Sequence, residues 1–106
     1  MPIVTIQALS PVDSGVLARM FAEIKEAGAR ALACEPSNIW VQFQPIAQSV
    51  PDSIVIVRAK TGRTREQRTA FAAAVSEVVN RTLSLEVWLD YQEMNPEDVW
   101  SNGKWN

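Results

Sequence analysis

The chain contains no histidine and only one cysteine, Cys34, among its 106 residues. An internal disulfide therefore cannot form, and there is no Cys/His cluster of the kind that holds zinc or copper. We accordingly expect a protein that works without a metal ion or other cofactor. The lack of disulfide chemistry also leads us to expect a cytoplasmic location.

Long apolar runs and runs of one charge are missing as well. No stretch approaches the roughly 20 apolar residues that a membrane span needs, and the opening MPIVTIQALSPVD does not resemble a secretion signal. Lysine and arginine are scattered, and the formal net charge is -2. Since polyanion binding requires a basic patch, we expect neither nucleic acid nor a membrane as a partner.

What the sequence does contain is an internal repeat. IVTIQALS at 3–10 matches IVIVRAKT at 54–61, and NIWVQFQP at 38–45 matches EVWLDYQE at 86–93. Each pair brackets a helical pattern, so we predict two strand-helix-strand units within a single domain. The units span residues 1–46 and 53–94, and the tail at 95–106 is expected to form a turn or a short hairpin.

Both helices carry recognisable start signals. Ser10, Pro11 and Asp13 have the pattern of an N-cap, a first-turn proline and an acidic cap partner. In the second unit, Thr64 and Gln67 have the spacing of a capping box. Apolar residues recur at three- and four-residue spacing beyond each start, which predicts two amphipathic helices.

A strand-helix-strand unit almost always forms a parallel pair with a right-handed crossover. Two units predict an α+β fold with a four-stranded mixed sheet and both helices on one face. The residues that should lie under the helices alternate along four segments: Val4, Ile6, Ala8, Ile39, Val41, Phe43, Val55, Val57, Ala59, Val87, Leu89 and Tyr91. The opposite face, with Trp40 and Trp88, is too apolar for water, and we expect it to meet other subunits.

Pro2 is the first candidate for chemistry. Initiator methionine is generally removed before a small residue, which would leave a secondary amine at the chain end. An α-amino group titrates near pH 8, and burial beside cations lowers its pKa, so Pro2 could act as a base near neutral pH. The matching residue of the second unit, Ser53, lies mid-chain. The alternative interpretation is an edge-strand proline without a role.

Cations form the second candidate, because Lys60, Arg63 and Arg65 lie in AKTGRTREQ at the predicted start of the second helix. An arginine can bind a carboxylate through two parallel hydrogen bonds, so this loop suits a small acidic substrate such as a 2-oxo acid. A solvated helix start is the alternative, although cations are disfavoured at that end of a helix.

Aromatic and acidic side chains complete the candidates. Trp100 is the best placed to line a pocket, while Trp40 and Trp88 are expected at an interface. The carboxylates that could activate a water show no diagnostic spacing, and we interpret each as a surface charge: Asp90, Glu93, Glu97 and Asp98.

The chain resembles the tautomerase superfamily along nearly its whole length. The resemblance is based on Pro2, the duplicated unit and the segment GRTREQRTAFAAAVSEVVNRTL. The second unit looks like 4-oxalocrotonate tautomerase. The double length and the ending DYQEMNPEDVWSNG look like macrophage migration inhibitory factor and the cis-3-chloroacrylic acid dehalogenases. The resemblance implies a homotrimer in which Pro2 moves a proton and Arg63 binds the substrate carboxylate. Lys60, Trp100 and Tyr91 are the expected substrate-binding residues.

Two departures from the family pattern affect this expectation. The arginine that polarises the substrate carbonyl in the single-repeat enzyme is matched here by Trp40 and Trp88, so that group must come from elsewhere or is missing. The dehalogenases use a histidine and a tyrosine, whereas this chain has no histidine and has Asp90 at the tyrosine position.

Three functions follow from the resemblance. The first is an isomerase that moves a proton in an enol or unsaturated 2-oxo acid, with Pro2 as general base. The second is a dehalogenase, hydratase or decarboxylase of a small three-carbon acid, with protonated Pro2 as the acid. The third is a non-enzymatic, cytokine-like binding protein.

Overall fold

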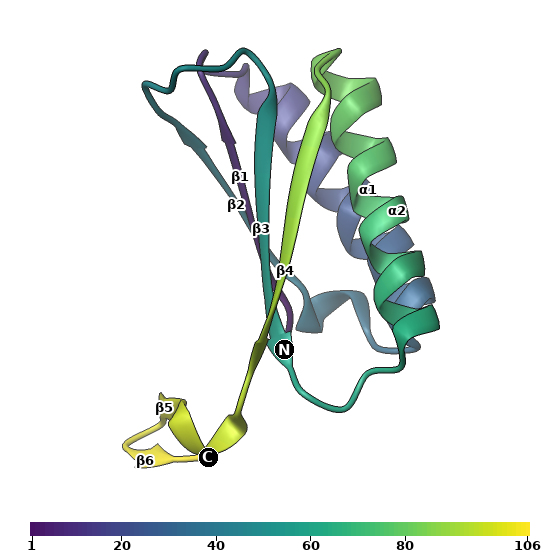
Figure 1. The fold of residues 1–106 in the computed structure, drawn as a ribbon, viewed down its shortest axis with the longest axis vertical. Coiled ribbons are helices and arrows are strands. Elements are labelled where there is room, and N and C mark those ends of the chain that lie inside the picture. Colours follow the sequence, from purple (N-terminus) through teal and green to yellow (C-terminus); the bar gives the residue numbers. More distant parts are fainter.

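A computed structural model describes all residues, 1–106, as two layers: a sheet on one side and two helices on the other (Figure 1). The first unit consists of β1 (Ile3–Ala8), α1 (Ser14–Leu32) and β2 (Trp40–Pro45), and the second of β3 (Ser53–Lys60), α2 (Arg65–Leu83) and β4 (Val87–Met94). Short 3-10 turns precede β2 at Pro36–Asn38 and follow β4 at Pro96–Asp98. The tail ends in a hairpin of β5 (Trp100–Ser101) and β6 (Lys104–Trp105).

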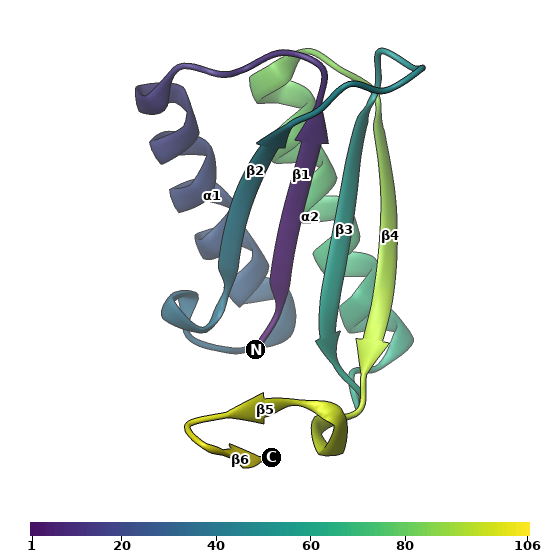
Figure 2. The same ribbon diagram turned by 90° about the vertical axis from the view of Figure 1, so that its left-hand side faces the viewer.

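The sheet has the order β2-β1-β3-β4. Each unit contributes a parallel pair, and the two units meet at an antiparallel β1–β3 pair in which Ile3 lies opposite Arg58 and Gln7 opposite Ile54. Both helices lie behind this sheet when its other face is viewed directly (Figure 2). The predicted duplicated architecture is therefore confirmed.

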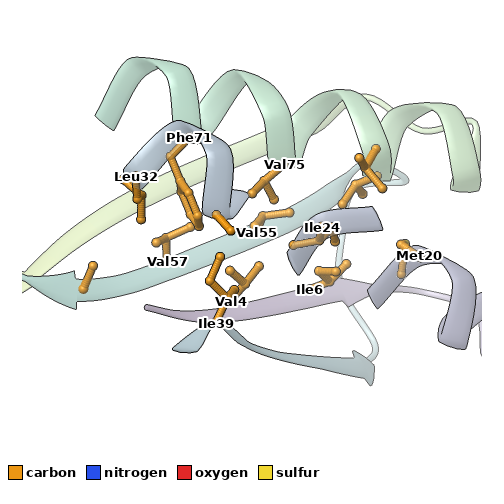
Figure 3. Packing of buried hydrophobic residues seen from close by; sticks show 14 residues of the cluster. Val4, Ile6, Met20, Ile24, Leu32, Ile39, Val55, Val57, Phe71 and Val75 are labelled. Atoms are coloured by element: carbon orange, nitrogen blue, oxygen red, sulfur yellow. The ribbon is translucent and has the colours of Figure 1, made fainter. Parts of the chain in front are cut away.

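The face under the helices forms the core as predicted. Val4, Ile6, Val55 and Val57 of the central strands are fully buried, whereas the apolar side chains of β2 and β4 are half-buried because these strands lie at the edges. The helices meet them with a stripe of apolar side chains that includes Ile24 and Phe71 (Figure 3). Burying a side chain of this size contributes roughly 1.5–3 kcal/mol relative to exposure.

Gly28 sets how closely α1 approaches the rest of the core. A Cβ atom on Gly28 would lie 2.7 Å from Cε1 of Phe71 and 3.0 Å from Cδ1 of Ile39. The first distance is shorter than packed carbon atoms tolerate, and the second would require Ile39 to shift slightly. The helix can therefore lie against the aromatic ring only because this position has no side chain.

The two helix starts differ in how well they follow the sequence patterns. The capping box of α2 is present: Gln67 N donates to Oγ1 of Thr64 over 3.1 Å, and Thr64 N donates to Oε1 of Gln67 over 3.0 Å. The predicted start of α1 was wrong, because the N-cap is Asp13 rather than Ser10. Its carboxylate accepts hydrogen bonds from Gly15 N at 3.0 Å and Val16 N at 3.3 Å.

The sheet face away from the helices, which we call the open face, has nothing packed over it. It carries Trp40, 54% exposed, and Trp88, 73% exposed, with Ile3, Ile54 and Ile56 half-buried beside them. Two exposed tryptophans on one uncovered sheet face, with isoleucines on the same face, indicate an interaction surface. Neither helix combines the length and the apolar character needed to cross a membrane.

Candidate functional site

The site is built around the N-terminus, which lies at the lower end of the sheet beside the tail hairpin (Figure 2). Pro2 precedes β1 and is fully buried. Its carbonyl oxygen accepts a hydrogen bond from Trp40 N at 2.9 Å, so the pairing of β1 with β2 extends to the second residue. The start of the chain is therefore held rigidly, while Met1 remains 40% exposed.

A cavity of about 610 Å³ opens next to this terminus. Met1 and Ile3 line it from the start of the chain, and Trp40 from the start of β2. The end of β3 supplies Arg58 and Lys60, and the remaining wall is the segment after β4: Met94, Pro96, Asp98, Val99, Trp100, Ser101, Asn102 and Asn106. The N-terminus and the cationic end of β3 meet here because β1 and β3 run antiparallel.

The surroundings of the N-terminus lower the pKa of its amine below the usual value of 8.0. Burial is the main cause, followed by the positive charges of Lys60 and Arg63, while Cys34 acts in the opposite direction. Burial and nearby cations both disfavour the protonated amine. This end of the chain therefore favours a neutral amine more than bulk water does.

The turn after β3 explains how Arg63 comes near the terminus. Gly62 has φ of 106°, a conformation that side chains rarely adopt, and Thr64 then caps α2. The GRTREQ run therefore forms a turn followed by a capping box, and it holds the half-buried Arg63 near enough for its charge to lower the pKa of the amine. Neither Arg63 nor Arg65 lines the cavity.

The structure brings together some of the expected site residues and not others. Lys60 and Trp100 line the cavity beside Met1, and Trp100 is 58% exposed. Tyr91 does not: it lies under the helices, edge-on to Phe71, with ring centroids 6.4 Å apart. Arg63 is not among the cavity-lining residues, although its charge lowers the pKa of the N-terminal amine and opposes the raised pKa of Tyr91.

Among the cavity residues that were not assigned to the site from the sequence, three are charged or aromatic. Trp40 was placed only on the open face, Arg58 was not singled out, and Asp98 was interpreted as a surface charge. The available signal for Arg58 was its spacing, because it precedes Lys60 by two residues and so shares its side of the strand. Asp98 carried no comparable signal, since its position depends on the path of the tail.

Other parts of the structure offer less chemistry. A hollow between the two helices is lined by Glu23, Glu77 and Arg81, but these charges pair with one another. No group of three or more His, Cys, Asp or Glu residues is arranged to hold a metal ion. The cavity at the N-terminus is thus the place where an ionisable amine and unpaired cations converge.

No protein-family model and no curated protein matches this chain. Solved structures do match over nearly the whole chain. A wild-type fused 4-OT, solved as an asymmetric trimer, has a TM-score of 0.87 at 15% identity and covers 97% of this chain and 94% of its own. Macrophage migration inhibitory factor from Toxoplasma gondii has a TM-score of 0.85 at 17% identity, and the match covers 98% of this chain and 99% of its own.

Two further matches extend the comparison. Pt0534, solved after inactivation by 2-oxo-3-pentynoate, has a TM-score of 0.82 at 19% identity and covers 96% of this chain and 93% of its own. N1, a member of the cis-3-chloroacrylic acid dehalogenase family, has a TM-score of 0.78 at 17% identity, and the match covers 97% of this chain and 82% of its own. At these identities the likeness establishes the fold. The resemblance expected from the sequence is confirmed at that level: this chain has the fold of the tautomerase superfamily.

Proposed function

We propose that this protein is an isomerase that moves a proton between carbon and oxygen in an enol or unsaturated 2-oxo acid. Removal of Met1 makes Pro2 the terminal residue, and its nitrogen is the general base. The observation that carries the proposal is the position of the N-terminal amine, which lies at a cavity lined by cations and has a lowered pKa. The similar solved structures include enzymes of this superfamily.

The proton transfer requires a neutral amine at working pH. The lowered pKa belongs to the Met1 amine. After Met1 is removed, we expect the same cations and the burial of Pro2 to act on the Pro2 nitrogen, which lies one peptide unit away. The neutral nitrogen takes a proton from one end of the conjugated system, and the resulting ammonium returns it at the other end. No net charge is gained or lost over the cycle.

The cations have a separate task. Arg63 binds the substrate carboxylate, and Lys60 stabilises the negative charge that develops on the oxygen as the enolate forms. Trp100 forms an apolar wall of the cavity that limits access of water to the reacting atoms. Tyr91 lies outside the cavity and has no part in this proposal.

We also propose that the protein works as a homotrimer. The support is the open face with its exposed Trp40 and Trp88, together with the trimeric form of the fused 4-OT structures. Stacking three sheets against one another would remove this apolar surface from water.

The test is exchange of the C3 protons of a 2-oxo acid with D2O, followed by proton NMR, after intact mass has shown that Met1 is lost. Pro2→Ala should slow the exchange by about 100-fold or more, the usual contribution of a positioned base. The wild-type rate should rise with pH up to the lowered pKa of the amine and then level off, because only the neutral form accepts a proton. Retention of Met1, or an unchanged rate in Pro2→Ala, would refute the proposal and favour a binding protein.

Asp98 supports a second candidate, addition of water to an unsaturated three-carbon acid, with loss of halide where the substrate carries one, because Asp98 lines the same cavity as Lys60. In that reaction Pro2 is the protonated acid and Asp98 activates the water. The pH profile separates the two candidates, since this reaction slows as pH rises through the pKa of Pro2.

A further inference from the structure

A second hollow lies at the end of the sheet farthest from the N-terminus, where β1 ends and β3 begins, at the upper end in Figure 2. Its volume is about 550 Å³, and we call it the distal hollow. The turn into α1, the loop before β3 and the end of α2 line it with mainly apolar side chains. The lining includes Leu9, Val12, Asp13, Pro51, Leu83 and Leu85.

The internal repeat makes the distal hollow the counterpart of the surroundings of the N-terminal amine. The sequence of β1 matches that of β3, and α1 and α2, which have equal lengths, follow at the same offset. Both helices also end in a residue of left-handed conformation, Ala33 in the first unit and Ser84 in the second. Residues of the two units can therefore be compared position by position from the strand to the end of the helix.

The ionisable groups around the amine have apolar counterparts at the distal hollow. Three such groups act on the amine, namely Lys60, Arg63 and Cys34. Their counterparts in the other unit all line the distal hollow: Leu9, Val12 and Leu85. Pro2 is matched by Ser53, which is fully buried and whose Oγ donates to the carbonyl oxygen of Gln7 over 3.2 Å. The duplicated fold thus has an ionic cavity with an amine at one end and an apolar hollow at the other.

Asp13 gives the distal hollow a charge opposite to that of the cations at the N-terminus. It is the one charged residue in the lining, and none of the four ion pairs of the structure includes it. Its Oδ2 atom accepts hydrogen bonds from Gly15 N and Val16 N at the start of α1. A carboxylate has two acceptor oxygens, so Asp13 can accept a further hydrogen bond while it caps the helix.

We propose that the distal hollow is a second binding site, separate from the N-terminal cavity, and that it takes small apolar amines. The hydrocarbon part lies against Leu9, Val12 and Leu85, and the ammonium group donates to Asp13. Burial of the hydrocarbon provides most of the affinity, because an exposed ion pair contributes little. The carboxylate of Asp13 decides which charge is accepted, since an acid would bring a second negative charge beside it. This inference does not depend on the proposed reaction of Pro2.

The experiment titrates the full-length protein with three six-carbon compounds that differ only at one end: hexan-1-amine, hexan-1-ol and hexanoate. Methyl NMR spectra locate the binding, because Leu9, Val12 and Leu85 all carry methyl groups in the same hollow. In wild type at pH 7, hexan-1-amine should shift these signals with a Kd of about 1 mM, the weak affinity expected of so small a ligand. Hexan-1-ol should bind there about threefold more weakly, and hexanoate about tenfold more weakly.

Two variants test the origin of the charge preference. Asp13→Asn keeps an efficient helix cap but removes the charge, so the amine and the alcohol should bind equally while the affinity for the alcohol is kept. The double variant Leu9→Lys, Val12→Arg installs the cations found at the matching positions of the second unit. It should reverse the preference, so that hexanoate binds more tightly than hexan-1-amine. Circular dichroism checks that both variants keep the fold.

The inference is overturned if hexan-1-amine shifts no methyl signal of the distal hollow, a result that a neighbouring subunit covering the hollow would also produce. It fails as well if wild type binds hexanoate as tightly as the amine. Retention of the amine preference in Asp13→Asn or in the double variant would show that Asp13 does not select the charge. A failure of the proton exchange at Pro2 leaves all these measurements unaffected.

Discussion

Tyr91 is the residue whose surroundings differ most from its expected role. Its hydroxyl oxygen is inaccessible to solvent and has no hydrogen-bond partner, and its ring packs edge-on against Phe71. Burial raises the pKa of Tyr91 above 10.0, although Arg63 and Arg68 act against this and Glu93 adds to it. The group is therefore held as a neutral phenol, and its contribution to stability depends on pH.

Replacing Tyr91 with phenylalanine should raise the free energy of unfolding at pH 7 by about 1 kcal/mol, because it removes a buried polar group that has no partner. In wild type, the unfolded phenol ionises near pH 10 while the folded one resists ionisation. Stability linked to this group is complete below pH 10 and is lost as pH rises through the folded pKa.

Urea unfolding at pH 7 and pH 11 measures both effects, and phenolate absorbance reports the titration directly because Tyr91 is the only tyrosine. The alkaline loss of stability should be smaller in Tyr91→Phe than in wild type. A variant less stable than wild type at pH 7 would mean that the hydroxyl has a partner.

At the scale of elements, both units consist of a strand, a helix and a strand, but their helices begin in different ways. α2 begins directly after a tight turn, so its capping residues are the first ones available. α1 begins six residues after β1, because Leu9–Val12 carry the chain from the sheet to the helix layer without repetitive structure. Asp13 is the first residue past that crossing whose side chain reaches the free amide groups, and its negative charge suits the helix N-terminus.

Asp13→Ala should therefore lower the free energy of unfolding by about 1 kcal/mol, whereas Ser10→Ala should change it by less than about 0.5 kcal/mol. Thr64→Ala is the positive control, with a loss similar to that of Asp13→Ala. Thermal or urea unfolding of the three variants decides the matter. A larger effect at Ser10 than at Asp13 would contradict the observed helix start.

At the scale of the whole molecule, the open face is the surface on which a single chain leaves large apolar side chains exposed to water. Trp88 lies on edge strand β4, and Trp40 occupies the matching position on edge strand β2. A tryptophan this exposed contributes little to the stability of a single chain, but it contributes strongly to an interface once a partner covers it.

Trp88→Lys should convert the proposed trimer into single chains without unfolding them, because it places a charge in the covered surface. Ala73→Lys, on the exposed side of α2, is the matched control and should leave the assembly intact. Light scattering after size exclusion gives the mass, and circular dichroism shows whether the fold is kept. An unchanged mass in Trp88→Lys, or a wild type already monomeric, would refute the trimer.

Much of the fold could be predicted because its causes are local or periodic. Alternation identified the buried side of each strand, and the repeat implied two equivalent strand-helix-strand units in one mixed sheet. The site was less predictable, because its residues come from four separate segments. Lys60, Arg63 and Trp100 could be singled out by type and position, whereas nothing short-range placed Asp98 at a cavity. Strand alternation had already placed Tyr91 on the helix-facing side, which agrees with its position outside the cavity.

The amino-acid sequence by itself determined the duplicated unit, the helix-facing apolar surface and the position of Pro2 at the start of a strand, since these depend on periodicity and chain order. Only the tertiary structure decided which charges face the N-terminus. The pairing of β1 with β3 places Ile3 opposite Arg58, and the path of the tail brings Asp98 and Trp100 to the same cavity. Alternation specifies the side of a strand on which a residue lies, but its neighbours across the sheet depend on pairings between residues distant in the chain.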